Sequence, residues 1–535
     1  LRTDSMKMEE STMNHARKAT RLATRKTASA VVSVGRVPVF AGIPAIVILI
    51  AISCITLPAA GKPRVVVMTD IGGDPDDQQS MVRFLSYANE FDIKGLYATS
   101  TGGRRNNIIN VSILEDMVTA WDSVRRNLTK HASGWPTKDY LLSVVKSGLR
   151  VEGITWCGHG NGARDPETGQ AGGICTPDID DLIGEGKDTV ASNHLITVID
   201  GSSNPTWVLA WGGTRELAQA IWKVKETRTA SQLNTFISRI RLYSISLQDE
   251  TMPWLIGEFP NLFIIRTIWS HRGIWAEASL DTSLFNSTWC DDNIRTNHGA
   301  LGAMYPGNLS SSAPDKHGMK EGDTPSLLYL IHNGLSDPDD PSMGNWGGRF
   351  YPTLSDKHWF EAEDDNPYSE KSMLRVYWSV SRWHVARQND FAARMDWQRY
   401  AKYGDANHNP VVTLNGNSTK DVVFHTATSG TSVQLSADGS TDPDGDALQY
   451  HWWEYYEAGS GQGTGTDEGP TISISNAFSS NAEFESPDVG SPKAIHIILE
   501  VTDNGSPNLT SYRRIVVTVK PEGSGSVRDG SSSEN

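Results

Sequence analysis

The segment Asp70-Ile-Gly-Gly-Asp-Pro-Asp-Asp77 follows an uninterrupted apolar run, Arg64-Val-Val-Val-Met68, and these two stretches decide the fold. A β-branched run without polar alternation is typical of a strand that is buried on both faces. The two glycines and the proline that follow predict a tight turn before a helix. The sequence therefore predicts a central parallel strand whose carboxyl end carries an acidic loop.

Further apolar runs repeat this pattern and alternate with segments of helical spacing. The runs are Ile93–Ala98, Thr206–Ala210, Ile240–Ile245 and Asn261–Ile265, and the helical segments include Ser80–Glu90 and Glu216–Lys225. Such alternation predicts an α/β domain with a mainly parallel sheet and helices on both faces. Small, polar or acidic residues follow each run, at the edge where open α/β sheets bind ligands.

The chain changes character after Lys371–Tyr403, a stretch rich in Trp and Arg that predicts one long helix or a broken pair. The strand-like runs beyond it, separated by Gly, Ser, Asn and Asp turns, are Ser432–Ser436, Leu448–Tyr455, Ile495–Thr502 and Arg513–Val519. Their spacing predicts an all-β, Ig-like sandwich. Trp452 and Trp453 are expected on opposite faces of one strand, one in the core and one at the surface.

These patterns divide the 535 residues into four parts. Residues 1–61 form a basic and then apolar N-terminal segment, and residues 62–408 the α/β domain. Residues 409–521 form the sandwich. The Gly/Ser-rich residues 522–535 are expected to be disordered.

The N-terminal part predicts export. Basic residues precede an uncharged apolar run from about Val37 to Ala60, roughly the ~20 residues that cross a bilayer. Its end, Leu57-Pro-Ala-Ala60, resembles a signal-peptidase site. A cleaved signal peptide and a retained signal anchor remain open, and both place the rest of the chain outside the cell, secreted or held at its surface.

Two further features agree with export. Seven Asn-x-Ser/Thr glycosylation acceptors occur, starting at residues 110, 127, 286, 308, 417, 504 and 508. Cys157 and Cys175 flank a Gly-rich loop and are candidates for a disulfide, although the cysteine count does not fix the pairing. The net charge of −15 argues against a nucleic-acid partner and leaves a neutral sugar or nucleoside-like ligand possible.

The acidic loop is the candidate site. Asp70, Asp74, Asp76 and Asp77 lie within eight positions, and carboxylates so crowded repel one another unless water or a cation intervenes. Oxygen ligands on a Gly-containing turn suit a hard cation, Ca²⁺ before Mg²⁺. The alternative is a solvated turn in which Asp76 or Asp77 caps the next helix. The position after a buried strand, at the ligand edge, favours the metal site.

The chain resembles the nucleoside hydrolase fold, whose opening motif is Asp-Thr-Asp-Pro-Gly-x-Asp-Asp. More specifically it resembles the cellulose-binding proteins with a nucleoside-hydrolase-like domain, over about Lys62 to Lys520. The matching segments are Thr69–Gln78, Trp207–Gly213, Glu321–Ser326 and Phe391–Trp397. The four segments together are more specific than the acidic loop alone.

The resemblance implies roles for particular residues. Asp70 matches a Ca²⁺ ligand, and Asp77 matches a ligand that also acts as general base. Asp76 matches a residue that holds sugar hydroxyls, and Asp323 matches a late ligand that completes the metal site. A backbone carbonyl near Thr214–Arg215 falls where the fold offers a main-chain ligand.

Departures from the motif weaken the match for catalysis. Met68 stands where the first Asp is expected, two residues are inserted before Asp76, and Gly322 stands where many nucleoside hydrolases have a His. Asn106 or Asn107 matches a sugar-contacting Asn only loosely. The leading hypothesis is an exported Ca²⁺-dependent hydrolase of glycosidic or N-glycosidic bonds, acting on or near plant-type polysaccharide. The alternative is a non-catalytic cellulose-binding protein on the same scaffold.

Four other residues are candidates with plainer alternatives. His159 and His317 are candidate acids or surface histidines. Asp249, at a strand end, is a candidate substrate contact or a helix cap. Trp346, after the acidic stretch Ser336–Asp340, is a candidate for stacking on a sugar at a mobile rim loop, or part of an ordinary solvated loop.

Overall fold

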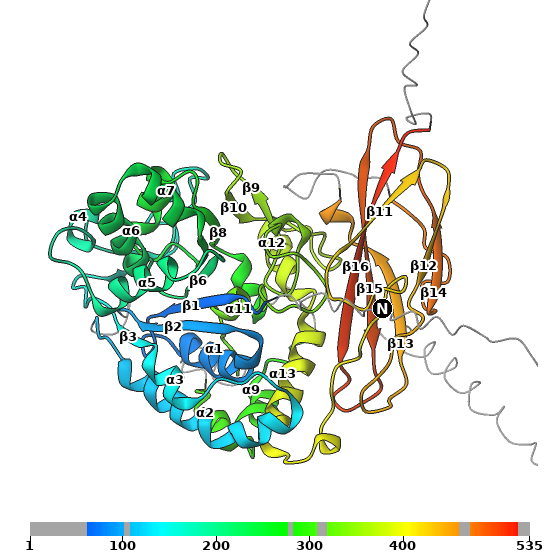
Figure 1. The fold of residues 1–535 in the computed structure, drawn as a ribbon, viewed down its shortest axis with the longest axis horizontal. Helices are drawn as coiled ribbons and strands as arrows, with labels where there is room; N and C mark the ends of the chain where they lie inside the picture. Colours follow the sequence, from blue (N-terminus) through cyan, green and yellow to red (C-terminus); the bar gives the residue numbers. More distant parts are fainter. Residues whose placement is uncertain (1–60, 101–106, 276–281, 308–317, 460–470, 523–535) are drawn as a thin grey trace, which may run out of the picture. The chain divides into compact units, whose positions relative to one another are not determined.

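The fold is taken from a computed structural model that describes residues 61–100, 107–275, 282–307, 318–459 and 471–522 (Figure 1). The apolar run that ends at Ala60, together with Asn106, His317 and the tail from residue 523, lies outside the described residues. Within the described part, none of the helices combines the length and apolarity needed to span a membrane.

The first domain is built on a large sheet of eight strands with the order β3-β2-β1-β6-β7-β8-β10-β9, as far as the described residues show. Its strands are β1 (Arg64–Thr69), β2 (Asp92–Ala98), β3 (Val145–Ser147), β6 (Thr206–Ala210), β7 (Ile240–Ile245), β8 (Phe263–Thr267), β9 (Phe350–Pro352) and β10 (His358–Glu361). All neighbours pair in parallel except β9 and β10. The prediction of a mainly parallel sheet is confirmed, and the five predicted strands occur within two residues of their expected bounds.

Helices cover both faces of this sheet (Figure 1). They are α1 (Pro75–Ser86), α2 (Val111–His131), α3 (Lys138–Ser143), α4 (Ile179–Leu182), α5 (Val190–Asp200), α6 (Arg215–Thr227), α7 (Ala230–Ser238), α8 (Thr251–Glu258), α9 (Ser287–Cys290), α10 (Gly299–Ala303), α11 (Thr324–Leu328), α12 (Ser372–Ser381) and α13 (His384–Arg399). Helices α12 and α13 form the broken pair that was one of the two predictions for residues 371–403.

The alternation of side chains along β1 separates two apolar layers. Val65 and Val67 pack in a core that includes residues of α1, α2 and α13. Val66 and Met68 pack in a second core, which includes residues of α5, α6, α7 and α8. A strand that is buried on both faces has no polar side to alternate with, so the Val-Val-Val-Met run follows from its central place in the sheet.

The strand order places a topological switch point between β1 and β6. From β1 the chain first extends the sheet through β2 and β3, and it later returns to the other side of β1 with β6. Loops that leave neighbouring strands in opposite directions open a crevice at their carboxyl ends, where such sheets bind ligands. Asp70 follows β1 and Gly212 follows β6 at this point.

The C-terminal domain is the predicted sandwich. A four-stranded sheet, β11-β16-β15-β13, faces the pair β12-β14. The strands are β11 (Val423–Thr428), β12 (Ser432–Ser436), β13 (Gln449–Glu454), β14 (Asn481–Glu485), β15 (Lys493–Thr502) and β16 (Thr510–Lys520). Trp452 is 1% exposed in the sandwich core, whereas Trp453 packs against Trp383. The expected opposite faces are confirmed, but the second ring lies against protein.

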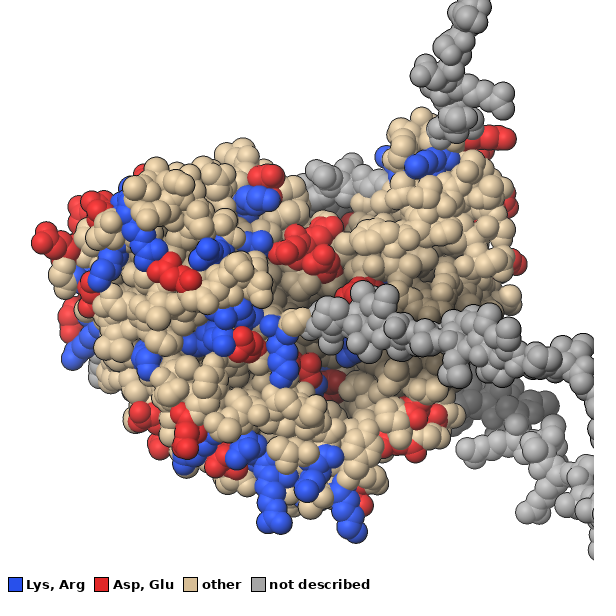
Figure 2. Space-filling model, viewed as in Figure 1, with Lys and Arg blue, Asp and Glu red and all other residues tan. Residues whose placement is uncertain are grey.

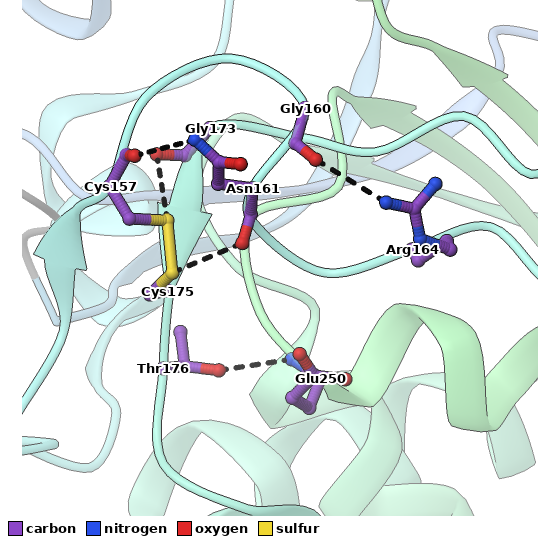
Figure 3. The surroundings of a disulfide bond; sticks show 8 residues. All are labelled: Cys157, Gly160, Asn161, Arg164, Gly173, Cys175, Thr176 and Glu250. Carbon is purple, nitrogen blue, oxygen red and sulfur yellow. Dashed lines mark hydrogen bonds between the residues drawn. A yellow bond between two sulfur atoms is a disulfide. The ribbon is translucent and has the colours of Figure 1, made fainter.

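Cys157 and Cys175 form a disulfide, with their Cα atoms 5.7 Å apart. It closes the short hairpin of β4 (Thr155–Trp156) and β5 (Ile174–Cys175) (Figure 3). Of the four cysteines, Cys290 is free and buried. On the face drawn in Figure 2, Lys and Arg side chains are interspersed with Asp and Glu.

Candidate metal centre

The loop between β1 and α1 depends on a glycine at position 72. Gly72 has φ +90°, and a Cβ built there would lie 2.6 Å from the side-chain nitrogen of Asn110. That nitrogen donates to the carbonyl of Ile71 at 2.8 Å, while Gly73 N donates to the carbonyl of Asp70 at 3.1 Å. Only glycine combines the left-handed backbone with this close approach. The loop that carries Asp70 is therefore a defined turn.

Helix α1 then places two carboxylates in its first turn. Pro75 is its first residue, and Asp76 and Asp77 follow. Asp74 stands at the N-cap position without a side-chain cap hydrogen bond. Neither Asp76 nor Asp77 is the N-cap, so the alternative prediction that one of them caps this helix is wrong. Both carboxylates lie at the positive end of the helix dipole, which favours their charged form.

A third carboxylate, from far along the chain, completes the group. Oxygens of Asp76, Asp77 and Asp323 lie within 4.8 Å of one another, and we call these three residues the carboxylate cluster. Asp323 is 2% exposed and Asp77 is 3% exposed. Within the described residues, Asp323 Oδ2 is buried and has no hydrogen-bond partner. A buried carboxylate oxygen without a donor is costly and marks a place where a cation would be accepted.

Asp70 borders this cluster from the switch point. A Cβ at Gly212, after β6, would lie 3.0 Å from the Asp70 Cβ and 3.1 Å from its Oδ1, so only glycine fits there. The charge of Asp70 also raises the pKa values of Asp77 and Asp323. Three of the predicted metal ligands, Asp70, Asp77 and Asp323, thus share one neighbourhood with Asp76.

The pKa values of the cluster show the cost of placing these charges together. Burial, followed by neighbouring carboxylates, raises the pKa of Asp77 and of Asp323 well above the usual value. Burial raises the pKa of Asp76 to about 6. The Thr69 hydroxyl donates to Asp77 Oδ1 and favours its charged form. Without a counter-charge the cluster therefore binds protons more tightly than exposed aspartates do.

One face of α1 holds the loop that brings in Asp323. Gln79 accepts from the backbone N–H groups of Lys320 and Glu321, at 2.6 and 3.1 Å. Arg83 pairs with Glu321 at 2.5 Å, both side chains being fully buried. Residues 76, 79 and 83 follow helical spacing and share that face. The helix that carries two carboxylates thus also positions the third.

Lys320 is a site residue that the sequence did not predict. Its ammonium pairs with Asp74, and the pKa of Lys320 is raised by Asp76, Asp74 and Asp323 despite its burial. It therefore supplies part of the positive charge that the carboxylates need. Its place directly before the matching segment Glu321–Ser326, three residues ahead of Asp323, is the signal that could have found it.

His271 is a second missed residue, and it lies beside Gly322. A Cβ at position 322 would be 3.0 Å from Asp76 Oδ2 and 3.7 Å from His271 Cδ2. The imidazole Nδ1 lies 3.1 Å from the Thr267 hydroxyl. Burial, with Arg272, His159 and Lys320, lowers the pKa of His271 well below its usual value. A neutral histidine from another loop thus stands beside the position where the expected one is missing.

Asp249 lies on the other side of Asp70. A Cβ at Gly213 would be 2.0 Å from Asp249 Oδ2. Asp249 Oδ1 accepts from Thr251 N at 3.0 Å, at the start of α8, and burial raises the pKa of Asp249. Asp70, Gly213, Arg215 and Asp249 line one cavity of about 20 Å³, room for about one water. Asp249 therefore both holds a helix start and borders the site.

Other predicted residues lie elsewhere. Trp346 is 1% exposed, and its indole N–H donates to the Tyr512 hydroxyl at 3.5 Å. It is a core residue, so the prediction that it stacks on a sugar at a mobile rim is wrong. His159 is exposed and lies 3.1 Å from Arg272. Asn107, the alternative to Asn106, has φ 49° and is half-buried.

The arrangement fits a hard divalent cation. All the donors are carboxylate oxygens, and the unpartnered Asp323 Oδ2 lacks a proton donor among the described residues. Oxygen-only donor sets of this kind suit Ca²⁺ or Mg²⁺ rather than softer metals. The residues present therefore fit such a cation, which Asp76, Asp77 and Asp323 would hold, with Asp70 beside them.

Comparison with known proteins agrees with this architecture. Residues 64–350 match the family model for "Cellulose-binding Sde182, nucleoside hydrolase-like domain", and residues 432–519 match the model for "Cellulose-binding protein Sde0182, C-terminal domain". A nucleoside hydrolase-related hypothetical protein of Saccharophagus degradans, associated with carbohydrate metabolism, is 36% identical, with a TM-score of 0.67. The similarity covers 86% of this chain and 100% of that one.

Two solved nucleoside hydrolases are only distantly similar to this chain. An inosine-uridine preferring nucleoside hydrolase from Bacillus anthracis is 11% identical over 62% of this chain and 99% of its own, with a TM-score of 0.31. A plant nucleoside hydrolase is 12% identical over 51% of this chain and 79% of its own, with a TM-score of 0.27. Among functionally curated proteins, none matches this chain.

Fold and site together define a nucleoside hydrolase-like protein with a C-terminal β-sandwich. Within that class, the chain belongs to the cellulose-binding Sde182 family, because one family model covers more than half of the chain and a second covers the sandwich.

Proposed function

We propose that this protein is a Ca²⁺-dependent hydrolase of glycosidic or N-glycosidic bonds. The observation that carries the proposal is the convergence of Asp76, Asp77 and Asp323 within 4.8 Å at the switch point of the sheet, with Asp323 Oδ2 buried and unpartnered. The family is described as cellulose-binding, and this supports our further proposal that the substrate lies on or near cellulose-like polysaccharide.

Asp77 is the proposed base. Its Oδ1 accepts a hydrogen bond from Thr69, which fixes the carboxylate, and its pKa is raised by burial and by Asp70 and Asp323. A carboxylate that binds a proton more tightly is a stronger base than an exposed one. When bound, a hard cation lowers the pKa of a water molecule and orients sugar hydroxyls. Asp77 would receive the proton from the attacking water.

His271 is the proposed contact for the leaving group. If the Thr267 hydroxyl donates to Nδ1, the single proton of the neutral ring lies on Nε2. The ring borders Gly322 and is therefore near Asp76. Asp76 is the residue that would bind a sugar hydroxyl. An N–H donor at that place stabilises charge that develops on a leaving oxygen or nitrogen.

The test compares Asp77→Ala with the unaltered protein on a panel of aryl glycosides, cello-oligosaccharides and nucleosides, with Ca²⁺ or with a chelator. We expect hydrolysis of at least one member, its loss on chelation, and a fall of about a hundredfold or more in the variant. Hydrolysis that neither treatment changes would overturn the proposal.

A second candidate is carbohydrate binding without catalysis. It is favoured by Met68, which is fully buried in the core at the position where the motif has an acidic residue. The family's description as cellulose-binding also favours it. Retention on insoluble cellulose without release of soluble sugar would support it. We also propose export, which the disulfide favours because such bonds persist in oxidising compartments.

A further inference from the structure

An aromatic group lies beside the carboxylate cluster and has no part in the proposed chemistry. It consists of Trp156, His159, Trp269 and Arg272, which we call the tryptophan platform. The His159 ring lies 4.7 Å from Trp156 and 5.4 Å from Trp269. Arg272 stacks over the Trp269 ring at 4.7 Å and lies 3.1 Å from His159 Nε2. Four residues from two loops thus form one contiguous surface.

Trp156 presents this surface to solvent. Its side chain is 39% exposed, although a large aromatic ring usually avoids water. The ring rests on Gly173, directly before β5 on the other side of the hairpin. A Cβ added at Gly173 would lie 2.4 Å from the indole. One side of the indole is thus supported by backbone. A supported and exposed indole is a flat apolar surface suited to a ring-shaped ligand.

The hairpin that carries Trp156 is fixed to the ligand edge of the sheet. The Cys157–Cys175 disulfide closes it, and the Thr176 hydroxyl accepts from Glu250 N at 3.2 Å (Figure 3). A Cβ at Gly172 would be 2.1 Å from the carbonyl of Leu247, in the segment between β7 and α8. Asp165, within the closed loop, pairs with buried Arg266 of β8. The platform is therefore held in place before any ligand arrives.

The second loop of the platform is fixed equally well and leads into the site. Glu361 accepts from the backbone N–H groups of Ile268, Trp269 and Ser270 at 2.7–3.1 Å. His271, the next residue, borders Gly322 and the carboxylate cluster. Since Arg272 follows directly, the platform begins one residue away from the proposed leaving-group contact.

We propose that the tryptophan platform is a sugar-stacking subsite that binds one pyranose ring of a glucan chain next to the bond held at the carboxylate cluster. This deepens the proposed function, on which it rests, by naming an oligosaccharide or polysaccharide chain as the substrate class. The Trp156 face carries the apolar side of the ring, and Arg272 and His159 supply polar groups for its hydroxyls. A nucleobase would also stack on an indole, and inosine therefore serves as the competing ligand in the test below.

The experiment measures binding of cellohexaose to the full protein by calorimetry, with inosine as the competing class of ligand. We expect Trp156→Ala to weaken cellohexaose binding about tenfold, the contribution of one stacked ring. Trp156→Tyr keeps a planar ring and should retain most of the affinity, which a general disturbance of the hairpin would not allow. Phe424→Ala removes a ring that is 70% exposed on the sandwich, and it should leave binding unchanged.

Equal cellohexaose affinity in Trp156→Ala and the unaltered protein would overturn the subsite. So would a loss confined to inosine, which would assign the platform to a base. Asp77→Asn separates the two proposals: it should abolish hydrolysis, and adding Trp156→Ala to that variant should still weaken cellohexaose binding about tenfold. If the unaltered protein binds cellohexaose through Trp156 and never cleaves it, the hydrolase proposal fails while the subsite stands.

Discussion

The carboxylate cluster and the single carboxylate of Asp364, both in the first domain, differ in the charged groups around them. In the carboxylate cluster, Asp76, Asp77 and Asp323 face one another, and burial with mutual repulsion raises their pKa values. Asp364, which is 0% exposed, lies instead between Arg349 at 2.6 Å and Arg382 at 2.9 Å. Although burial opposes it, these two arginines lower the pKa of Asp364.

The difference separates a structural carboxylate from a functional one. Asp364 has its counter-charges within the fold, so its ionised form is part of the stable structure. In the cluster, Lys320 lowers the pKa values of Asp76 and Asp323, and Asp323 Oδ2 lacks a donor among the described residues. Its missing charge must come from protons or from a bound cation. Substitutions at the two places should therefore have opposite effects on stability.

The largest effect is expected from Asp364→Asn. Loss of the shared carboxylate leaves buried Arg349 without its counter-charge, whereas half-buried Arg382 keeps Glu457 at 3.1 Å. Breaking such a buried pair costs about 3–5 kcal/mol of unfolding free energy. Urea unfolding followed by fluorescence measures it. Asp323→Asn, studied in a chelator, is the matched control, and its unfolding free energy should be unchanged or higher. A similar loss in both variants would remove the distinction.

For Ca²⁺ affinity, in contrast to stability, the larger loss should come from a substitution in the carboxylate cluster. Asp323→Asn removes a ligand of the cluster and should weaken Ca²⁺ binding about a hundredfold or more, that is by about 3 kcal/mol. Calorimetric titration measures the affinity. Asp165→Asn alters a buried carboxylate that is paired with Arg266 outside the cluster, and it should leave Ca²⁺ affinity unchanged. If Asp323→Asn binds Ca²⁺ normally, the metal lies elsewhere.

The stability of the protein in a chelator should depend on pH through Asp76. Its folded-state pKa is raised from 3.8 to about 6, so the folded state binds the proton more tightly than the unfolded state. This group stabilises the folded state most below about pH 4. Its contribution falls by about 3 kcal/mol in total as the pH rises from there through about 6.

Thermal melts between pH 4.5 and 7.5 measure this dependence. Asp76→Asn should flatten the curve, and saturating Ca²⁺ should raise stability most at the upper end, because the cation replaces the protons. An unaltered curve in Asp76→Asn would show that other groups, such as Glu454 with a pKa raised to about 7, are responsible.

The smallest effect is expected from Lys320→Gln. The ammonium neutralises part of the cluster and repels an incoming cation, so its removal should strengthen Ca²⁺ binding about three- to tenfold. Titration at low and high salt measures this, and the gain should shrink with salt. Weaker binding in Lys320→Gln would instead show that the lysine positions Asp74 or the loop.

The sequence predicted the parts of the site that local pattern controls. The apolar runs gave β1, β2, β6, β7 and β8, because a strand covered on both faces must be apolar throughout. Asp70 and Asp77 were predicted from the acidic loop after the first strand, and the family resemblance added Asp323 to the same group. The sandwich followed from turn spacing, although β11 and β14 were missed because their exposed polar residues weaken the pattern.

What the sequence could not supply are the contacts between distant segments. Trp346 was expected at a surface because its neighbours are acidic, yet the fold covers it with Tyr512, 166 residues further along. His271 and Lys320 carry no local sign of function, and they reach the cluster only because β8 and the 320–323 loop converge on α1. The tryptophan platform likewise joins residues 156 and 269.

The sequence by itself therefore determined where the apolar strands lie and that an acidic loop ends the first of them, since both follow from periodicity and composition. Only the tertiary structure decided which carboxylates remain without an arginine partner. The physical reason is that burial and counter-charge are properties of a residue's neighbours in space, and the strand order of the sheet chooses those neighbours.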